Sequence, residues 1–337
     1  MSSSRMRQKR ASDADWDSEV LQHFSTQERY LVAVSGGRDS VALLHWLLSK
    51  GYSKLIVCHL DHRLRGRSST ADARFVEHLA LDAGLRFFAA SADVRLLARK
   101  TKRSTETAAR NARYDFFAAA AVRHRCRTIF LAHHSDDLVE TFLFNLFRGG
   151  GGRSMRAVSL HTIGKTSLTL VRPLLHVWRD EIDQYVRSQG LRFREDASNA
   201  SLDPARNRMR HRIIPGLEKE FGRAIRKAIW RAALIASEED ALLATMLPND
   251  LLRREKLRVN SLRQQPVALQ RRAIRAWLRQ NGVADIGFEL IERVRSLLGP
   301  TAGPAKVNLP EERYARRRAG ELFLEEPSHK LQKGRQR

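Results

Sequence analysis

The chain has 337 residues, 42% of them hydrophobic, and a formal net charge of +24 at pH 7. This length allows two domains with ordinary cores, and no apolar run reaches the ~18 residues of a membrane span. The charge disfavours an enzyme that handles only small metabolites and favours a polyanionic partner, most simply nucleic acid; an arginine-rich proteome is the alternative explanation.

We expect a cytoplasmic protein. The N-terminus is polar and lacks the apolar central region of a secretory signal. Cys58 and Cys126 form no C-x-x-C pair, so neither a zinc knuckle nor a redox motif is indicated. Residues 1–28 are basic and begin with a serine-rich stretch, and we expect a largely disordered extension with a short helical segment near residues 16–24.

An anion site is predicted where the first strand ends. Residues 31–34 are typical of a buried strand, the Ser-Gly-Gly of residues 35–37 breaks it, and Asp39 and Ser40 begin a buried helix. Gly36 and Gly37 let the backbone approach an anion, toward which the first helical amides point. Asp39 would repel phosphate unless a divalent cation lay between them, so the loop predicts magnesium as well.

The stretch S-G-G-R-D-S at residues 35–40, which includes Ser35, Arg38 and Ser40, resembles the PP-loop of ATP pyrophosphatases. In that family the loop holds the β- and γ-phosphates, and ATP is split to AMP and pyrophosphate. The alternative is an ordinary strand–turn–helix connection that happens to contain two glycines.

Further strands and helices alternate along the chain. Strands are predicted at residues 54–60, 85–91 and 128–132, with helices at 70–83 and after residue 137. This alternation predicts an α/β fold with a doubly wound parallel sheet, whose ligands bind at the carboxyl ends of the strands. Residues 61–65 follow the second strand at that edge.

Two groups of charged side chains lie beside these elements. Arg110 and Arg113 share a helix face, and a pair of arginines facing the phosphate loop could neutralise charge on an attacked phosphorus; a solvated helix face is the alternative. His133 and Asp137 follow the fourth strand, and Glu140 faces the same way as Asp137. A zinc site is disfavoured, whereas carboxylates that share magnesium or bind an ammonium group fit better.

A second phosphate motif is rejected. Residues 164–167, G-K-T-S, end like a Walker loop, but Ser159 stands where its first glycine belongs and no buried strand leads in.

From residue 217 onward the pattern is helical and strand signals fade. Residues 206–231 hold nine Arg or Lys against two Glu, and residues 253–279 hold nine against one. We therefore expect amphipathic helices with basic outer faces. The expected domains are an extension at 1–28, a catalytic domain at 29–216, a helical basic domain at 217–325 and a tail at 326–337.

Six motifs occur in a characteristic order: V-S-G-G-R-D-S, L-D-H-R-L-R, E-T-A-A-R-N-A-R-Y, L-A-H-H-S-D-D-L-V-E-T, V-R-P-L-L, and E-D-A-S-N with R-N-R-M-R-H-R-I-I-P. Over residues 29–216 the chain resembles the tRNA(Ile)-lysidine synthetases, in their compact form. The helical remainder looks like the tRNA-contacting domain of that family, and the basic extension lies outside the shared pattern.

The resemblance implies a ligase that uses ATP with Mg²⁺, free L-lysine and tRNA-Ile. The wobble cytidine attacks ATP to give an adenylated base and pyrophosphate, and lysine then expels AMP. Residues 35–40 would hold the pyrophosphate; Asp39 and Asp137 would hold magnesium, and Arg110 and Arg113 would steady the α-phosphate and the base. His133, Asp137 and Glu140 would line the lysine region. The arginines expected to contact tRNA are Arg63, Arg65, Arg113, Arg206, Arg208 and Arg210. The sequence leaves open a homodimer.

Three alternatives remain from the residues. A PP-loop tRNA thiolase usually relies on cysteine pairs, which this chain lacks. A PP-loop ligase for a small metabolite does not explain the charge. A non-catalytic RNA-binding protein with a decayed ATP site does not explain the intact Asp39, Asp137 and arginine pair.

Overall fold

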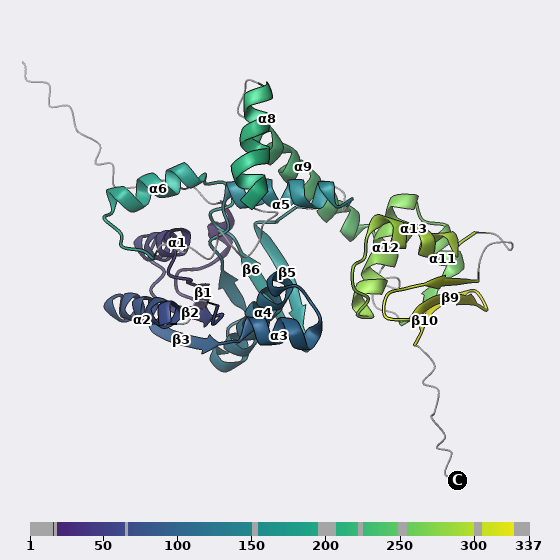
Figure 1. The fold of residues 1–337 in the computed structure, drawn as a ribbon, viewed down its shortest axis with the longest axis horizontal. Helices are drawn as coiled ribbons and strands as arrows, with labels where there is room; N and C mark the ends of the chain where they lie inside the picture. The colour runs from purple at the N-terminus through teal and green to yellow at the C-terminus, as the bar shows by residue number, and fades with distance from the viewer. Residues whose placement is uncertain are drawn as a thin grey trace, which may run out of the picture. The chain divides into compact units, whose positions relative to one another are not determined.

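A computed structural model gives the fold (Figure 1), in which two compact units are each described by themselves. The structure describes residue 16 and residues 19–64, 67–149, 154–194, 207–221, 225–248, 255–299 and 305–326. Among these residues, no helix is both long and apolar enough to cross a membrane.

The first unit contains a six-stranded sheet in the order β3-β2-β1-β4-β6-β5. Its strands are β1 (Tyr30–Ala33), β2 (Leu55–Asp61), β3 (Arg86–Ser91), β4 (Thr128–Phe130), β5 (Val158–Ile163) and β6 (Thr166–Val171). All neighbours pair in parallel except β5 with β6. The predicted α/β fold with a mostly parallel sheet is therefore confirmed, and an antiparallel hairpin at one edge is added to it.

Helices cover both faces of this sheet. They are α1 (Arg38–Ser49), α2 (Arg67–Asp82), α3 (Val94–Thr101), α4 (Thr105–His124), α5 (Ser135–Phe147) and α6 (Arg179–Ser188). Along β1, Val32 packs in the core that holds Leu43 and Trp46 of α1, whereas its neighbour Leu31 packs with Phe117 of α4. Because strand side chains alternate, a strand covered on both faces must be apolar throughout, which explains the continuous apolar run.

The hairpin explains the rejected Walker-like motif. Ile163 pairs with Thr166, and Gly164 between them has a φ of +55°, which favours glycine. The G-K-T-S sequence therefore forms the turn between two antiparallel strands and the first two residues of β6. Its rejection as a phosphate loop is confirmed.

The remainder of the chain begins with helices. The first unit continues with η3 (Met209–Ile213, a single π-helical turn) and α8 (Ile214–Phe221), and α9 (Ile225–Thr245) follows. The later elements are β7 (Leu257–Arg258), α11 (Val259–Arg263), α12 (Val267–Gln280), α13 (Phe288–Ser296), β8 (Lys306–Asn308), β9 (Tyr314–Arg318) and β10 (Glu321–Glu325).

The second unit is not purely helical. Strands β7 to β10 form an antiparallel sheet in the order β7-β10-β9-β8, which the sequence did not predict. Its core joins Ile274 and Trp277 of α12 with Ile291 of α13 and Leu322 of β10. The helical part of the prediction is confirmed, and the sheet corrects it.

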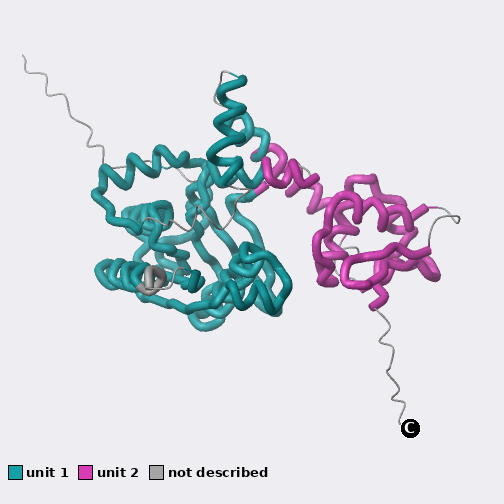
Figure 2. The backbone as a smooth tube through the Cα atoms, viewed as in Figure 1, with its two compact units in different colours: residues 1–142, 155–233 teal, residues 143–154, 234–337 magenta. Residues whose placement is uncertain are grey.

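The compact units are residues 1–142 with 155–233, and residues 143–154 with 234–337 (Figure 2). The predicted domain boundary at residues 216–217 lies inside α8, whereas the units divide at residues 233–234. At the N-terminus, Trp16 is buried against Trp46 and Tyr185, and the short helix η1 (Glu19–His23) follows it. The described part of the extension therefore packs against the first unit.

Candidate active site

The glycine loop after β1 is held by its own serines. Ser40 Oγ donates to the Gly37 carbonyl at 2.8 Å, and the backbone N–H groups of Ser35 and Gly37 donate to Ser40 Oγ and Ser35 Oγ, both at 3.2 Å. Gly36 has a φ of +91°, and a Cβ there would lie 3.2 Å from Val76. Glycine is thus required at this position by both conformation and space.

Helix α1 begins directly at this loop. Its N-cap is Gly37, which has no side chain to accept from the first-turn amides. The positive end of the helix dipole and these amides therefore point toward an anion bound at the loop. Arg38 forms ion pairs with Asp39 and with Asp183 of α6, so its guanidinium is held at the first turn of α1.

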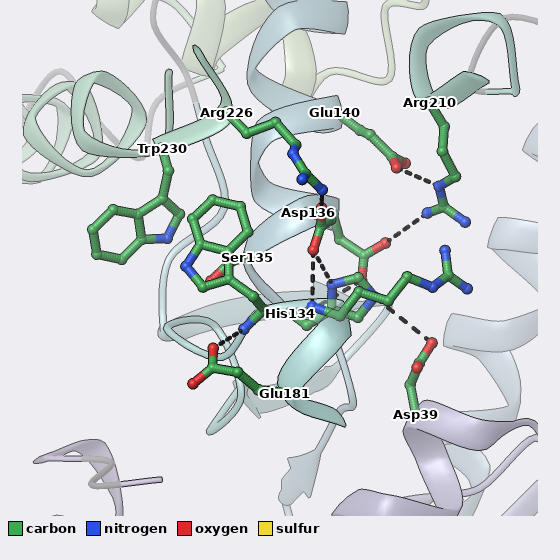
Figure 3. Close-up of polar contacts among 12 residues, drawn as sticks. Asp39, His134, Ser135, Asp136, Glu140, Glu181, Arg210, Arg226 and Trp230 are labelled. Carbon is green, nitrogen blue, oxygen red and sulfur yellow. Dashed lines mark hydrogen bonds and ion pairs between the residues drawn. The ribbon is translucent and has the colours of Figure 1, made fainter. Parts of the chain in front are cut away.

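The centre of the site is His134, which directly follows the predicted His133 (Figure 3). It is 1% exposed, and its Nε2 lies 3.4 Å from Asp137 Oδ2 and 3.7 Å from Asp39 Oδ2. Its Nδ1 lies 3.7 Å from Asp136 Oδ2. The buried imidazole therefore connects the first turn of α1 to the first turn of α5.

Electrostatics fix the charges of this cluster. Burial lowers the pKa of His134, but Asp137, Asp39 and Asp136 outweigh it and raise that pKa to about 9. Burial raises the pKa of Asp39, but His134 and Arg38 outweigh it and hold that pKa well below its usual range. The pKa of Asp137 is likewise raised by burial and lowered further by His134 and His133. At neutral pH an imidazolium thus lies among carboxylates.

A buried carboxylate extends the cluster along α5. Glu140 is 3% exposed, and Arg210 Nε donates to its Oε1 at 2.6 Å. Arg210 Nη2 also lies 3.5 Å from Asp137 Oδ1. Asp137 and Glu140 therefore face the same cation, as their spacing predicted. Glu140 and Asp137 raise the pKa of Arg210 against the effect of burial, so its charge is secure.

Asp136 links three helices through its two carboxylate oxygens. Its Oδ2 accepts from the backbone N–H of Arg179 at 3.0 Å, at the start of α6, and its Oδ1 accepts from Arg226 of α9 at 3.2 Å. Trp230, one turn later on α9, donates to the Leu175 carbonyl at 3.2 Å. These bonds join α5, α6 and the start of α9 around the site (Figure 3).

A cavity of about 520 Å³ opens beside these groups, and both acidic and basic side chains line it. Its lining residues are Arg38, Asp136, Glu140, Arg179, Asn207, Arg210, His211, Ile214, Pro215, Glu218 and Arg226. A small zwitterionic ligand could find partners for both of its charges here.

The predicted arginines are not all at this cluster. Arg110 is exposed, and its guanidinium carbon lies 5.1 Å from the ring centroid of Tyr114 on the same helix. Arg113, Arg63 and Arg208 are exposed as well. Arg65 and Arg206 lie outside the described residues.

The oxygen and nitrogen side chains of the site decide whether it could hold magnesium. In the described part of the chain, no three His, Cys, Asp or Glu side chains are grouped to hold a metal ion. Asp39 and Asp137 are close enough for their charges to interact, and both offer hard oxygen ligands. Two carboxylates with substrate phosphates are the usual protein share of a magnesium site, so the residues fit that ion.

Two family models match separate stretches of the chain. Residues 11–217 match the family described as the PP-loop domain, and residues 257–323 match the TilS substrate binding domain. A solved U34-tRNA thiolase, NcsA from Methanococcus maripaludis, superposes with a TM-score of 0.51 over 63% of this chain and 72% of the thiolase. At 18% identity this likeness shows the fold alone.

Curated relatives are similar over most of the chain. The tRNA(Ile)-lysidine synthase of Geobacter sulfurreducens is 38% identical over 86% of this chain and 63% of its own length. The enzymes of that name from Thermosynechococcus vestitus and Chlorobaculum tepidum are 34% and 32% identical over 83% and 84% of their own lengths. The chain thus spans under two thirds of the Geobacter relative and most of the other two.

Proposed function

The chain belongs to the tRNA(Ile)-lysidine synthase family, and we propose that it ligates free lysine to carbon 2 of the wobble cytidine of tRNA-Ile. In the first step the carbon-2 oxygen bonds to the α-phosphorus of ATP and pyrophosphate leaves. In the second, the lysine ε-nitrogen bonds to carbon 2 and AMP leaves with that oxygen. The reaction would take place in the cytoplasm, which supplies all three substrates.

The loop at residues 35–40 takes the departing pyrophosphate in this proposal. The uncapped first turn of α1 and the glycine backbone supply donors at the point where negative charge accumulates. Asp39 and Asp137 would hold a magnesium ion, which neutralises phosphate charge when bound. Arg38 is anchored by Asp183, which keeps a positive charge beside the same turn.

One observation carries the proposal: His134 joins Asp39 to Asp137, and Asp137 and Glu140 share one cation. The nucleotide loop and a pair of carboxylates suited to an ammonium group thus lie side by side. In the structure the Arg210 guanidinium binds to these carboxylates, so the pair accepts a cationic side chain. We assign the lysine amine to the same pair.

The attacking amine must lose a proton. His134 is a poor acceptor at neutral pH, since its pKa of about 9 keeps it protonated. Asp137 is a weak base because its pKa is lowered. We therefore assign proton acceptance to the neutral form of His133, which lies within electrostatic reach of Asp137.

Residues 257–323 support the RNA part of the proposal, because they match the substrate binding domain of this family. Exposed arginines occur there on α12, α13 and β9. The thiolase alternative is not favoured: the only two cysteines, Cys58 and Cys126, are both buried.

The test incubates the full chain with bulk tRNA, ATP, Mg²⁺ and labelled lysine. We expect label that stays in the RNA, with one AMP and one pyrophosphate released per lysine. The same mixture without lysine should release pyrophosphate but no AMP, because the adenylate stays on the base until lysine attacks. Transfer of sulfur to the tRNA, or ATP cleavage without lysine incorporation into any tRNA, would contradict the proposal.

A further inference from the structure

Arg172, the residue after β6, is buried, and no described carboxylate neutralises it. It is 6% exposed, and its Nη1 donates to the Arg156 carbonyl at 2.7 Å and to Ser159 Oγ at 2.9 Å. Its Nε has no acceptor among the residues that the structure describes. Both acceptors are neutral, and within the residues that the structure describes no carboxylate forms an ion pair with Arg172.

A second arginine, Arg110, is near enough for its charge to act on Arg172. Arg110, in the second turn of α4, has its guanidinium over Tyr114, and the Tyr114 ring stacks on His161 of β5 with 4.0 Å between centroids. Burial lowers the pKa of Arg172 and the charge of Arg110 lowers it further, against an opposite effect of Tyr114. Across the described ranges Arg110 has no acidic partner either.

Two neighbouring cations that no described carboxylate neutralises carry a cost in free energy, above all where one of them is buried. A desolvated charge costs several kcal/mol unless it is paired, and neutral acceptors offset only part of this. Arginine would stay protonated in spite of the lowered pKa. An anionic ligand that reaches both guanidiniums removes the penalty.

The position of Arg172 relative to the sheet indicates which anion binds to the two arginines. β6 is separated from β1 by β4, so Arg172 follows a strand about 10 Å from the one that carries the phosphate loop. The triphosphate belongs at that loop, next to the uncapped start of α1. A phosphate group about 10 Å away, beside stacked rings, is better supplied by the polynucleotide that is being modified.

We propose that Arg172 and Arg110 form an anion subsite that holds one backbone phosphodiester of the RNA substrate next to the reacting nucleotide. Arginine suits this ligand because its planar donors match phosphate oxygens in pairs. The contact would fix the position of the RNA strand without reading its sequence. The identity of the RNA rests on the proposed function; the anion subsite itself rests on the geometry.

The test measures binding, so that it does not depend on lysine ligation. Affinities of the full chain for an anticodon stem-loop RNA and for ATP are measured at several salt concentrations. We compare wild type with Arg172→Gln, Arg172→Lys and Arg110→Gln, and with Ser159→Ala as the matched control that removes one acceptor of Arg172 but no charge.

We expect Arg172→Gln and Arg110→Gln each to weaken RNA binding about tenfold and to lower the slope of log affinity against log salt by about 0.7. Ser159→Ala should keep the wild-type values, and Arg172→Lys should keep the salt slope but bind RNA more weakly, because lysine retains the charge without the paired donors. ATP binding should be unchanged in every variant, which would separate Arg110 from the α-phosphate role that the family resemblance implies. Neutral methylphosphonates are placed one at a time in the RNA loop. At one position the substitution should weaken RNA binding by the wild type about tenfold and leave RNA binding by Arg172→Gln unchanged.

Three results would overturn the inference. The first is an RNA affinity and salt slope that are unchanged in both glutamine variants. The second is an equal loss of affinity for ATP, which would assign the subsite to the triphosphate. The third is an equal loss of RNA affinity in Ser159→Ala, which would make Arg172 a hairpin anchor. Arg110 is exposed, so its variant remains informative if Arg172→Gln fails to fold. A wild-type chain that binds RNA but transfers no lysine would refute the proposed function alone.

Discussion

The imidazole of His134 lies 3.7 Å from the carboxylate of Asp39, although 95 residues separate them in the chain. The contact crosses from the loop after β1 to the segment after β4, the next strand in the sheet. Parallel neighbours deliver their carboxyl ends to one edge, so two short polar segments become one charged cluster there. His134 supplies the positive charge that allows Asp39 and Asp137 to remain ionised together.

We predict that His134→Gln destabilises the protein by roughly 3 kcal/mol, because removing one partner of a buried ionic cluster leaves the others unbalanced. Urea unfolding, followed by circular dichroism, measures the change. His78→Gln on the exposed face of α2 is the matched control and should stay within about 0.5 kcal/mol of wild type. Equal stability of the two variants would remove His134 from the centre of the cluster.

The same residue predicts a pH dependence. Its pKa is raised from 6.5 to about 9 on folding, so its stabilisation is complete below pH 6.5 and is lost as the pH rises through 9. Between pH 6 and 8.5, without magnesium or ATP, the free energy of unfolding should fall by about 2 kcal/mol. His134→Gln should lack this decrease. The range ends at pH 8.5 because the buried Cys58, whose pKa is raised to about 12, adds its own loss above pH 9.

The sequence located this cluster but not its central residue. The run after β4 offers two adjacent histidines, and the pattern selected His133. Which of them turns inward depends on how the chain leaves the strand: Ser135 N donates to the Val177 carbonyl, and this long-range bond, with the His134 N–H on Asp137, turns the second ring into the core. Such a contact between distant residues leaves no local signal.

Strand β9 was missed because charged side chains hide its alternation. In β9, Tyr314–Arg318, arginines occupy both faces, and only Ala315 of the strand is fully buried. The sequence Y-A-R-R-R therefore has no period of two in hydrophobicity, although its side chains alternate. The β1, β2 and β4 strands were predictable because both of their faces are buried.

Asp39→Asn should leave less than a tenth of wild-type pyrophosphate release. The variant keeps the shape of a side chain that is 30% exposed but removes the charge that faces His134 and would hold magnesium. Asp183→Asn is the matched control, since both carboxylates pair with Arg38. Pyrophosphate is measured with tRNA and lysine at saturation. A variant that retains more than a tenth of the turnover would refute the ligand role of Asp39.

Glu140→Gln should raise the lysine KM about tenfold or more while the ATP KM changes little, because the amine then lacks a charged hydrogen-bond partner. The two dependences are measured separately by label incorporation into tRNA. Glu292→Gln, a carboxylate of the second unit that also pairs with arginines, is the control and should change neither. An unchanged lysine dependence in Glu140→Gln would disprove the assignment. Asp137 variants are harder to interpret, since Asp137 also contacts His134.

The basic second unit should carry much of the tRNA affinity. A fragment that ends near Pro215 is a poor test, because it would lack Arg226 and Trp230, which bond to Asp136 and Leu175 of the first unit. We therefore use the full chain with Arg279, Arg293 and Arg318, three exposed arginines of α12, α13 and β9, changed to Gln. Each arginine that neutralises a phosphate releases counterions, so the salt slope of tRNA binding should fall by roughly 0.7–0.9 for each phosphate that is no longer neutralised.

The matched control changes the exposed Arg123, Arg125 and Arg127 to Gln. These residues lie at the end of α4 and just before β4, at the opposite edge of the sheet from the glycine loop, and the variant has the same net charge as the first. It should keep the wild-type slope, apart from a small long-range effect that salt screens. ATP binding should be unchanged in both variants and reports that the first unit is folded. Equal slopes in the two variants would show that total charge, and not an RNA-binding surface on the second unit, sets the affinity.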